Sequence, residues 1–573
     1  MRLSMKKQIK VIAQLLLLML IVTSCNSQAS KNNDSKSKLS IAEAISVLPN
    51  ATIKETIDYY HKLKKEQPRT YNFDDEAELN RLGYQYLNNG KIKEAIEIFK
   101  LLVSEFPNSS NPYDSLAEAY NTDGNTDLAI KNYEKSLELN PKNINAEAWI
   151  NQLKYSEYDA TRFYKKYSLE EYGQDLDELG RRLTEVNPNA YKFITKDAFW
   201  KALTAKKELL TEHTTFSEFI WHCSEIIATI SCSHTSMGFF SQERKMLPDS
   251  LRFPLRTRLL DNNLYVINPL TNKGKVMIED EIVEINGIAI DTIKNEIYKH
   301  ISSQGEIESS KKSFFNAHST SIIPYALNFP ASYNVRIKNQ KEPIRLSQLA
   351  SYKDEFKSLS TYLCKEELCL NYLEDNKTAI MTVSTFAFYG NRFPEFKNFM
   401  DVSFSELSKK GIENLIIDVR GNGGGTSDAG IYLIRYLSQK PFTYFSKSQF
   451  NESLESNNPH PNVFKGKVYA LIDGSGGSTT GHFMSLVKHL ELATIVGEEL
   501  GSNQFCTGGQ KMLRLPNTGI IYVVGRNTYE TIATSLPIER GIMPDHEVSQ
   551  SIKDYLNHTD RVMEYTKALI NKD

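Results

Sequence analysis

Four short apolar segments set the architecture of the last third of the chain, at residues 379–383, 415–419, 468–472 and 493–496. Uninterrupted apolar runs of this length are typical of parallel strands that are buried on both faces of a sheet. Helix-like stretches alternate with these runs, which restricts the region to an α/β layer. We therefore expect an α/β core over residues 346–573.

Two of the predicted strands run into glycine loops. The strand at 415–419 continues into RGNGGG at residues 420–425, and the strand at 468–472 leads into GSGGSTTGHF at residues 474–483. If the two loops meet in space, one presents the hydroxyl of Ser478 and the other presents a row of backbone N–H groups. Acyl transfer requires this combination, a nucleophile beside donors for an oxyanion.

An internal repeat of 34 residues covers residues 78–145, and its equivalent positions are Leu82 and Leu116, Tyr86 and Tyr120, Gly90 and Gly124, Ala95 and Ala129, Phe99 and Tyr133, and Pro107 and Pro141. This period is typical of tetratricopeptide helix pairs. An earlier segment, 55–68, parallels 94–107, so we expect all-α repeats over residues 41–152. The repeats form either a groove for a protein partner or a spacer.

The N-terminus has the pattern of an export signal. A basic start precedes an apolar run at residues 11–22, which is too short to span a bilayer comfortably, and Thr23-Ser24-Cys25 follows. A cysteine directly after small residues resembles a bacterial lipobox, which implies a signal peptide at 1–24, lipidation of Cys25 and a flexible tether at 25–40. A plain signal with a chance cysteine is the alternative. We expect an exported lipoprotein of the cell envelope, facing the periplasm or the cell surface, that contacts the membrane through Cys25.

The net charge and the spacing of the cysteines limit which partners and cofactors the chain is expected to bind. The net charge is −2, so nucleic acid is not expected as a partner. No cysteine spacing matches a zinc site, and neither a metal nor an organic cofactor is expected. Each of two cysteine pairs, Cys223 with Cys232 and Cys364 with Cys369, could close a short loop in an exported chain.

The middle of the chain is predicted to hold two further parts. Residues 153–232 have helical apolar spacing and would form a cap on the core. Residues 233–345 begin with a strand-like SHTS segment and continue with short strands around the turn Asn286-Gly287, a pattern that resembles a PDZ domain. This PDZ-like part either binds a peptide or forms a small lid without a ligand.

Ser478 needs a base, because a free serine is a poor nucleophile at neutral pH. His482 lies one helical turn beyond Ser478, and His234 belongs to the cluster at residues 233–236. Composition and spacing do not choose between the two histidines.

Five blocks carry a resemblance over most of the chain after residue 155. They are SHTS at 233–236, LIIDVRGNGGG at 415–425, ALIDGSGGSTTGHF at 470–483, TIVGEELGS at 494–502 and IERGIMPDHEV at 538–548. In this order they resemble the C-terminal processing, or tail-specific, serine peptidase family. The resemblance implies a crotonase-like α/β peptidase core.

The resemblance also implies roles for particular residues. No lysine follows Gly497-Glu498, so the chain is similar to the tricorn-core and interphotoreceptor-retinoid-binding branch, which uses histidine. In that scheme Ser478 is the nucleophile and His234 is the base. Glu539 polarises the histidine with Ser233 as a bridge, while Gly424 and Thr479 donate N–H groups to the oxyanion, with Gly423 as competitor to Gly424. Gly481 departs from the family pattern, which has glutamate there.

The expected function is cleavage of polypeptides through an acyl-enzyme, with the substrate entering extended and tail first. One rival is a catalytically inactive envelope scaffold that binds peptides or other ligands on the same fold. A second rival is a different hydrolase or a crotonase-type acyl enzyme.

Overall fold

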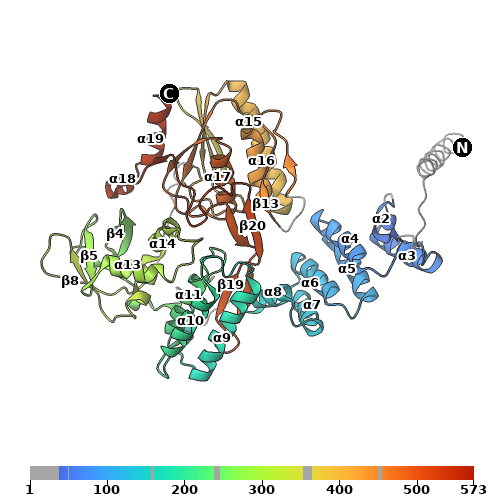
Figure 1. The fold of residues 1–573 in the computed structure, drawn as a ribbon, viewed down its shortest axis with the longest axis horizontal. Helices are drawn as coiled ribbons and strands as arrows, with labels where there is room; N and C mark the ends of the chain where they lie inside the picture. The colour runs from blue at the N-terminus through green and yellow to red at the C-terminus, as the bar shows by residue number, and fades with distance from the viewer. Residues whose placement is uncertain are drawn as a thin grey trace. The chain divides into compact units, whose positions relative to one another are not determined.

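The computed structural model describes residues 38–48, 51–155, 160–237, 246–352, 364–448 and 454–572 (Figure 1). The predicted signal, Cys25 and nearly all of the tether lie outside the described residues. Two compact units divide the chain, residues 1–82 and residues 83–573.

The described residues of the first unit include the helices α2 (Ile41–Ser46) and α3 (Ile53–Glu66) and the paired two-residue strands β1 (Leu39–Ser40) and β2 (Tyr71–Asn72). Helix α3 begins after Thr52, whose side chain accepts from the N–H of Glu55 while Glu55 accepts from the N–H of Thr52. This reciprocal cap fixes the start of the helix. Helix α4 (Glu76–Asn88) spans the boundary between the two units.

The repeat region of the second unit is helical, as predicted, with α5 (Ile92–Glu105), α6 (Ser110–Thr122), α7 (Thr126–Leu139) and α8 (Ile144–Lys154). Ala95 and Ala129 have no exposed surface, and so neighbouring helices can approach closely there. Pro107 and Pro141 follow the ends of α5 and α7, since proline cannot donate the next helical hydrogen bond.

A helical cap follows the repeats. It contains the short helix η1 (Ala160–Tyr164) and the helices α9 (Leu169–Val186), α10 (Lys196–Glu208) and α11 (Phe216–Ala228). Its apolar core is completed by a hairpin from far along the chain, β18 (Lys511–Arg514) and β19 (Ile521–Val524), which contributes Leu513 and Tyr522. Helix α8 also contacts this hairpin, where the Asn151 amide donates to the Met512 carbonyl at 3.1 Å.

An antiparallel sheet stands where the PDZ-like part is predicted. Its strand order is β3-β4-β5-β7-β8, with bounds β3 (Arg256–Leu260), β4 (Asn263–Asn268), β5 (Glu281–Ile285), β7 (Asn334–Ile337) and β8 (Ile344–Arg345). The Asn286-Gly287 turn joins β5 to the short strand β6 (Ile288–Ala289). Helices α13 (Ile290–Tyr298) and α14 (Glu308–Ala326) pack on this sheet, and α14 contacts the edge strand β3. Short helices η2 (Asp249–Leu251) and η3 (Leu270–Asn272) lie in its connections.

The core is a six-stranded mixed sheet in the order β21-β16-β15-β11-β10-β9. Its strands are β9 (Leu368–Tyr372), β10 (Thr378–Val383), β11 (Asn414–Asp418), β15 (Lys467–Ile472), β16 (Thr494–Gly497) and β21 (His546–Glu547). Only the pairing of β9 with β10 is antiparallel. The four predicted apolar strands correspond to β10, β11, β15 and β16, and their location is confirmed to within one or two residues.

Helices cover both faces of this sheet (Figure 1). One apolar cluster joins it to α15 (Phe393–Lys410), α16 (Ser427–Leu437) and α17 (Thr479–His489), and another joins it to α19 (Arg561–Ile570). The remaining elements of this region are η5 (Gly390–Arg392), α18 (Ile552–Leu556), β12 (Phe442–Thr443), β13 (Phe445–Lys447), β14 (Ser456–Asn457), β17 (Phe505–Gly508) and β20 (Asn527–Thr531).

The cysteines decide between the two predicted pairings. Cys364 and Cys369 form a disulfide, whereas Cys223, Cys232 and Cys506 are free and buried. The pairing of Cys223 with Cys232 is therefore wrong. Cys223 lies within α11 and belongs, like Cys232, to the apolar core of the cap.

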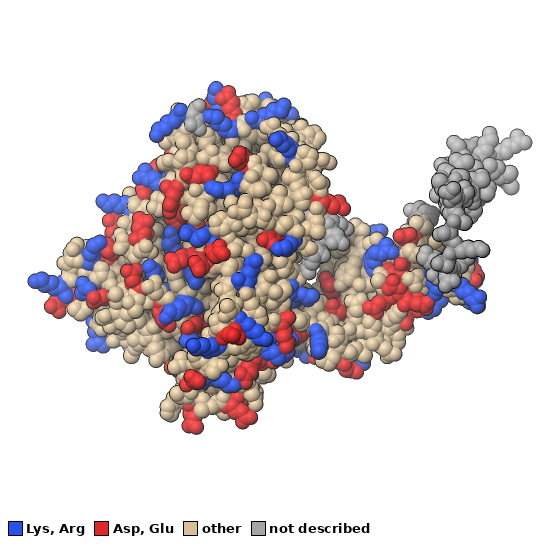
Figure 2. Space-filling view, in the orientation of Figure 1, with Lys and Arg blue, Asp and Glu red and all other residues tan. Residues whose placement is uncertain are grey.

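Surface charge is mixed. Figure 2 shows basic and acidic side chains interspersed over the face in view. Among the described residues, no helix is both long enough and apolar enough to cross a membrane.

Candidate active site

Ser478 stands at the sharp turn between β15 and α17. It is the N-cap of α17, with φ 53° and ψ −122°, a backbone conformation that is strained for a residue with a side chain. The turn is held in place from the other glycine loop, because the Asn422 carbonyl accepts from the N–H of Gly477 at 3.0 Å and from the Thr480 hydroxyl at 2.9 Å. Ser478 is half-buried and borders a cavity of about 360 Å³.

The two glycine loops meet, as predicted. A Cβ added to Gly424 would lie 2.6 Å from the Cβ of Ser478 and 2.9 Å from the backbone nitrogen of Thr479. Gly424 also has φ +101°, which residues with a side chain rarely adopt. Only glycine therefore allows this loop to lie against the serine.

The three predicted oxyanion donors differ in their present partners. The N–H of Gly424 donates to the Asn422 side-chain oxygen at 2.9 Å, and the Asn422 amide donates in turn to the Val383 carbonyl at 2.9 Å. Within the described residues, the N–H groups of Gly423 and Thr479 have no hydrogen-bond acceptor. Gly423 and Thr479 are thus free to bind an oxyanion, whereas Gly424 is already engaged. Sequence reasoning missed Asn422, for which only its place inside the glycine loop was a signal.

The close packing around residue 481 explains why glycine stands there. A Cβ at this position would lie 2.5 Å from the Ser502 hydroxyl oxygen and 2.6 Å from the Asn503 carbonyl oxygen. The first turn of α17 packs so closely on this segment that a glutamate at Gly481 would not fit.

His234 borders the same cavity as Ser478, although the two are far apart in the sequence. It is 8% exposed, and its Nδ1 lies 3.2 Å from the Ser233 hydroxyl oxygen. Burial lowers the pKa of His234 to about 4, so the imidazole is neutral near pH 7 and can accept a proton. Its segment is attached to β19 by two backbone hydrogen bonds between Ser236 and Val523, of 3.1 and 2.9 Å.

His482, the other candidate base, also borders this cavity. It lies on α17, one turn after Ser478, and is 3% exposed. The structure therefore brings Ser478, His234 and His482 to one cavity.

Glu539 is not brought to the histidine in the part of the chain that the structure describes. Its side chain is exposed, and its backbone carbonyl accepts from the N–H of Glu306 at 2.9 Å. Ser233 instead borders a second cavity together with Glu498, whose carboxylate pairs with Lys312 of α14 at 2.5 Å. No local sequence signal pointed to Lys312, because 186 residues separate it from Glu498.

The second cavity, of about 470 Å³, lies between the small antiparallel sheet and the nucleophile turn. Leu260 of β3 and Phe314 of α14 line it on one side, and Gly474 to Gly477 line it on the other. Arg258 also lines it and stacks on Tyr555, with 4.4 Å from the guanidinium carbon to the ring centroid. Among the described residues Arg258 has no acidic partner.

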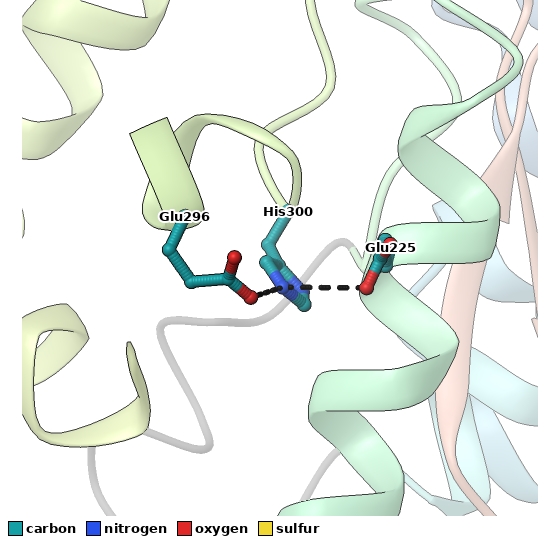
Figure 3. A group of neighbouring side chains, drawn as sticks. All are labelled: Glu225, Glu296 and His300. Carbon is teal, nitrogen blue, oxygen red and sulfur yellow. Dashed lines mark hydrogen bonds and ion pairs between the residues drawn. The ribbon is translucent and has the colours of Figure 1, made fainter. Parts of the chain in front are cut away.

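One cluster has the residue types of a metal site, Glu225, Glu296 and His300 (Figure 3). The His300 Nε2 lies 3.4 Å from a Glu296 oxygen and 3.6 Å from a Glu225 oxygen. Both carboxylates already have ammonium partners, because Glu225 pairs with Lys206 and Glu296 pairs with Lys299. We attribute this cluster to the packing of α13 against α11.

Residues 377–548 match the family model described as "Peptidase family S41". Residues 81–109 and 111–143 each match a model described as "Tetratricopeptide repeat". No curated protein sequence matches the chain. The S41 match includes Ser478 and both glycine loops but not His234.

One solved structure supports the fold, and two others are reported as similar chains. A crystal structure of a CPAF mutant has 14% sequence identity, covers 71% of this chain and 98% of its own, and has a TM-score of 0.50. Mature CPAF complexed with lactacystin, also 14% identical, covers 71% and 99% with a TM-score of 0.48. The photosystem II D1 C-terminal processing protease is 13% identical and covers 68% and 99% with a TM-score of 0.34.

The repeats, the mixed sheet and the match over 377–548 lead to one assignment. The chain carries tetratricopeptide repeats followed by a peptidase family S41 domain, and it is a serine peptidase.

Proposed function

We propose that the chain cleaves polypeptides through an acyl-enzyme formed on Ser478. The observation that carries the proposal is the shared cavity, whose lining includes a strained, half-buried serine, a buried neutral imidazole and Thr479 with its free backbone N–H. These are the three components that peptide-bond cleavage by serine requires.

In the proposed mechanism the Ser478 oxygen attacks the scissile carbonyl carbon while His234 accepts the hydroxyl proton. The carbonyl oxygen becomes an oxyanion, which the N–H groups of Thr479 and Gly423 stabilise. His234 then gives the proton to the leaving amine, and the C–N bond breaks. A water molecule next attacks the ester, with His234 again as base, and frees Ser478. Because Thr479 is the first residue of α17, the positive end of the helix dipole adds to the stabilisation.

We assign the positioning of His234 to Ser233. The Ser233 hydroxyl is 3.2 Å from Nδ1, so it can fix the ring orientation that leaves Nε2 for the serine. Glu539, which the sequence resemblance proposes as the polarising acid, would act only indirectly, because its side chain is exposed.

We further propose that substrates enter by their C-terminal tails. β3 is an edge strand of the small antiparallel sheet, but α14 covers its outer edge, where the Asn316 side chain hydrogen-bonds both the N–H and the carbonyl of Leu259. We therefore propose that side chains, and not strand addition, hold the tail. The second cavity beside it offers Arg258 for a terminal carboxylate and Leu260 and Phe314 for an apolar side chain. Its far wall is the turn that carries Ser478, so a bound tail would lie next to the nucleophile.

We also propose that the chain is exported, that it is attached to a membrane and that it binds a protein partner. The sequence of residues 1–25 supports export and membrane attachment through a lipidated Cys25. The tetratricopeptide helices would hold a protein partner, as such repeats commonly do.

Covalent labelling tests the proposed function. A fluorophosphonate should label the wild-type protein, and Ser478→Ala should remove the label. Casein or a peptide library should be hydrolysed while acyl thioesters are not, which separates a peptidase from a crotonase-type enzyme. If Ser478 is never labelled and no peptide is cleaved, the fold serves as a binding scaffold.

A further inference from the structure

His482 has no assigned task in the proposed mechanism, yet it lies in the active-site cavity. It is 3% exposed, and neither ring nitrogen has a hydrogen-bond partner among the described residues. A buried polar group that lacks a partner destabilises the folded state, so such groups in folded proteins need an explanation. Because His482 borders the cavity, its nitrogens can be satisfied by a group that enters there.

The imidazole of His482 offers one donor and one acceptor. Burial, and then the nearby His234, lower the pKa of His482 to about 3, so the ring is neutral. A neutral imidazole has an N–H on one nitrogen and a lone pair on the other, and it can therefore bind a hydroxyl or an amide in either sense.

The surroundings of His482 are aromatic and uncharged. Phe445 meets the imidazole edge-on with ring centroids 5.3 Å apart, and Tyr529 lies at 6.3 Å. Cys506 lines the same wall and is 4% exposed. In the described part of the chain, no Lys, Arg, Asp or Glu lines this cavity. A charged substrate side chain would lose its hydration there without gaining an opposite charge.

We propose that His482 determines substrate specificity by hydrogen-bonding the side chain of the residue whose carbonyl Ser478 attacks. The favoured residue has an apolar body, which fits the Phe445 and Tyr529 walls, and an uncharged polar end, which meets His482. Tyrosine at this position is favoured over phenylalanine. A site built around a hydrogen bond discriminates strongly against an analogue that lacks the group, because its own polar atom then stays unpaired. The inference rests on the proposed function and deepens it.

Two peptidyl diphenyl phosphonates test the inference, identical except for Tyr or Phe in the residue next to phosphorus. Each reacts as the serine oxygen bonds to phosphorus, phenoxide leaves and the hydroxyl proton passes to the base. The wild-type protein should react at least about tenfold faster with the Tyr reagent. His482→Phe should bring the ratio of the two rates to about one or below.

Two further variants complete the design. His482→Gln keeps a hydrogen-bonding group and should retain a preference for Tyr, which also covers the case in which His482→Phe does not fold. His489→Phe is the matched control, because His489 lies on the same helix but is exposed and does not line the cavity. It should leave the ratio at its wild-type value.

Other outcomes overturn the inference. Equal rates for the two reagents in the wild type, or a ratio unchanged in His482→Phe, would exclude specificity through His482. A parallel loss of both rates by orders of magnitude, with the ratio intact, would instead make His482 the base. Fluorophosphonate labelling separates the two levels of failure, because labelled Ser478 without Tyr preference leaves the proposed function standing. If Ser478 is not labelled, the proposed function fails and this inference fails with it.

Discussion

Ser478 and Gly424 lie in two loops that follow neighbouring strands of the core sheet. His234 borders the same cavity as Ser478 but belongs to a segment outside that sheet. The approach of the two glycine loops, here called the glycine side of the site, results from the parallel pairing of β11 with β15. In this pairing Asp418 lies opposite Leu471, and each strand ends at its loop. The position of His234, here called the histidine side of the site, depends on a short segment that is attached to β19. Strand β19 belongs to a hairpin whose apolar side chains pack in the helical cap.

Because of this difference, we expect the two sides of the site to be sensitive to different kinds of mutation. At Gly424 and Gly425, neighbouring atoms are so close that an added methyl group has no space. Around His234, position depends on a few polar contacts made over almost 300 residues of sequence, such as the 3.1 Å bond from the N–H of Gly525 to the Thr235 hydroxyl. We therefore expect the glycine side to respond to volume and the histidine side to respond to lost hydrogen bonds.

The largest effect should come from removing the imidazole of His234. His234→Ala should lower kcat by roughly 10³-fold or more, because Ser478 then has no general base. The thermal midpoint and the circular dichroism spectrum should remain close to those of the wild type. Turnover near the wild-type rate would transfer the role of base to His482, the other imidazole in the cavity.

A volume change tests the glycine side. Gly424→Ala should lower kcat/KM by about 10²-fold, because the new Cβ would displace the loop from the serine and disturb the oxyanion donors. It should also lower the free energy of unfolding by about 1–3 kcal/mol, since φ at this position is +101°.

Gly423→Ala is the matched control for stability. Nothing lies within 4 Å of a Cβ built at Gly423, and its φ is not in the left-handed region. Chemical denaturation should therefore give the same unfolding free energy as for the wild type. Equal destabilisation by the two variants would mean that close contact at Gly424 is not the cause.

The pH profile distinguishes a buried base from an exposed one. Because burial lowers the pKa of His234 to about 4, kcat/KM should stay flat from pH 8 to about pH 5 and fall as the pH approaches 4. An ordinary histidine with a pKa of about 6.5 would be only about 3% neutral at pH 5, which predicts a thirtyfold loss there. A midpoint of activity near 6.5 would show that His234 is hydrated in the working enzyme.

The sequence predicted the glycine side of the site better than the histidine side. Buried strands and glycine loops are local patterns, so β10, β11, β15 and β16 and the meeting of two loops could be predicted. The 34-residue repeat was equally visible, because each helix pair repeats the same small and apolar positions.

The long-range contacts could not be predicted in this way. Nothing in the sequence near Lys312 indicates that it pairs with Glu498, and nothing near Leu513 indicates that it completes the core of the cap. Asn422 engages the N–H of Gly424 through a side-chain rotamer, which no spacing rule fixes. For the cysteines, spacing allowed two pairings, and the fold leaves Cys223 and Cys232 as free thiols in the apolar core of the cap.

A smaller effect should follow from weakening the attachment of the His234 segment. Val523→Pro removes the N–H that donates to the Ser236 carbonyl at 2.9 Å. One lost hydrogen bond of about 1 kcal/mol corresponds to roughly a fivefold lower rate of fluorophosphonate labelling. An unchanged labelling rate in a folded variant would show that this attachment does not position the histidine.

The smallest effect on kcat/KM is expected for Glu539, and comparing it with Ser233 shows which of the two residues positions His234. Glu539→Gln changes an exposed side chain and should alter kcat/KM by no more than about twofold. Ser233→Ala removes the hydroxyl at 3.2 Å from Nδ1 and should cost more, because the ring loses the contact that fixes its orientation. Comparing the pH profiles of both variants extends the test, since only a group that acts through the imidazole shifts the acidic limb. If Glu539→Gln proves the more damaging, the carboxylate must reach Ser233 during turnover, and the histidine side would then rearrange while the glycine side stays fixed.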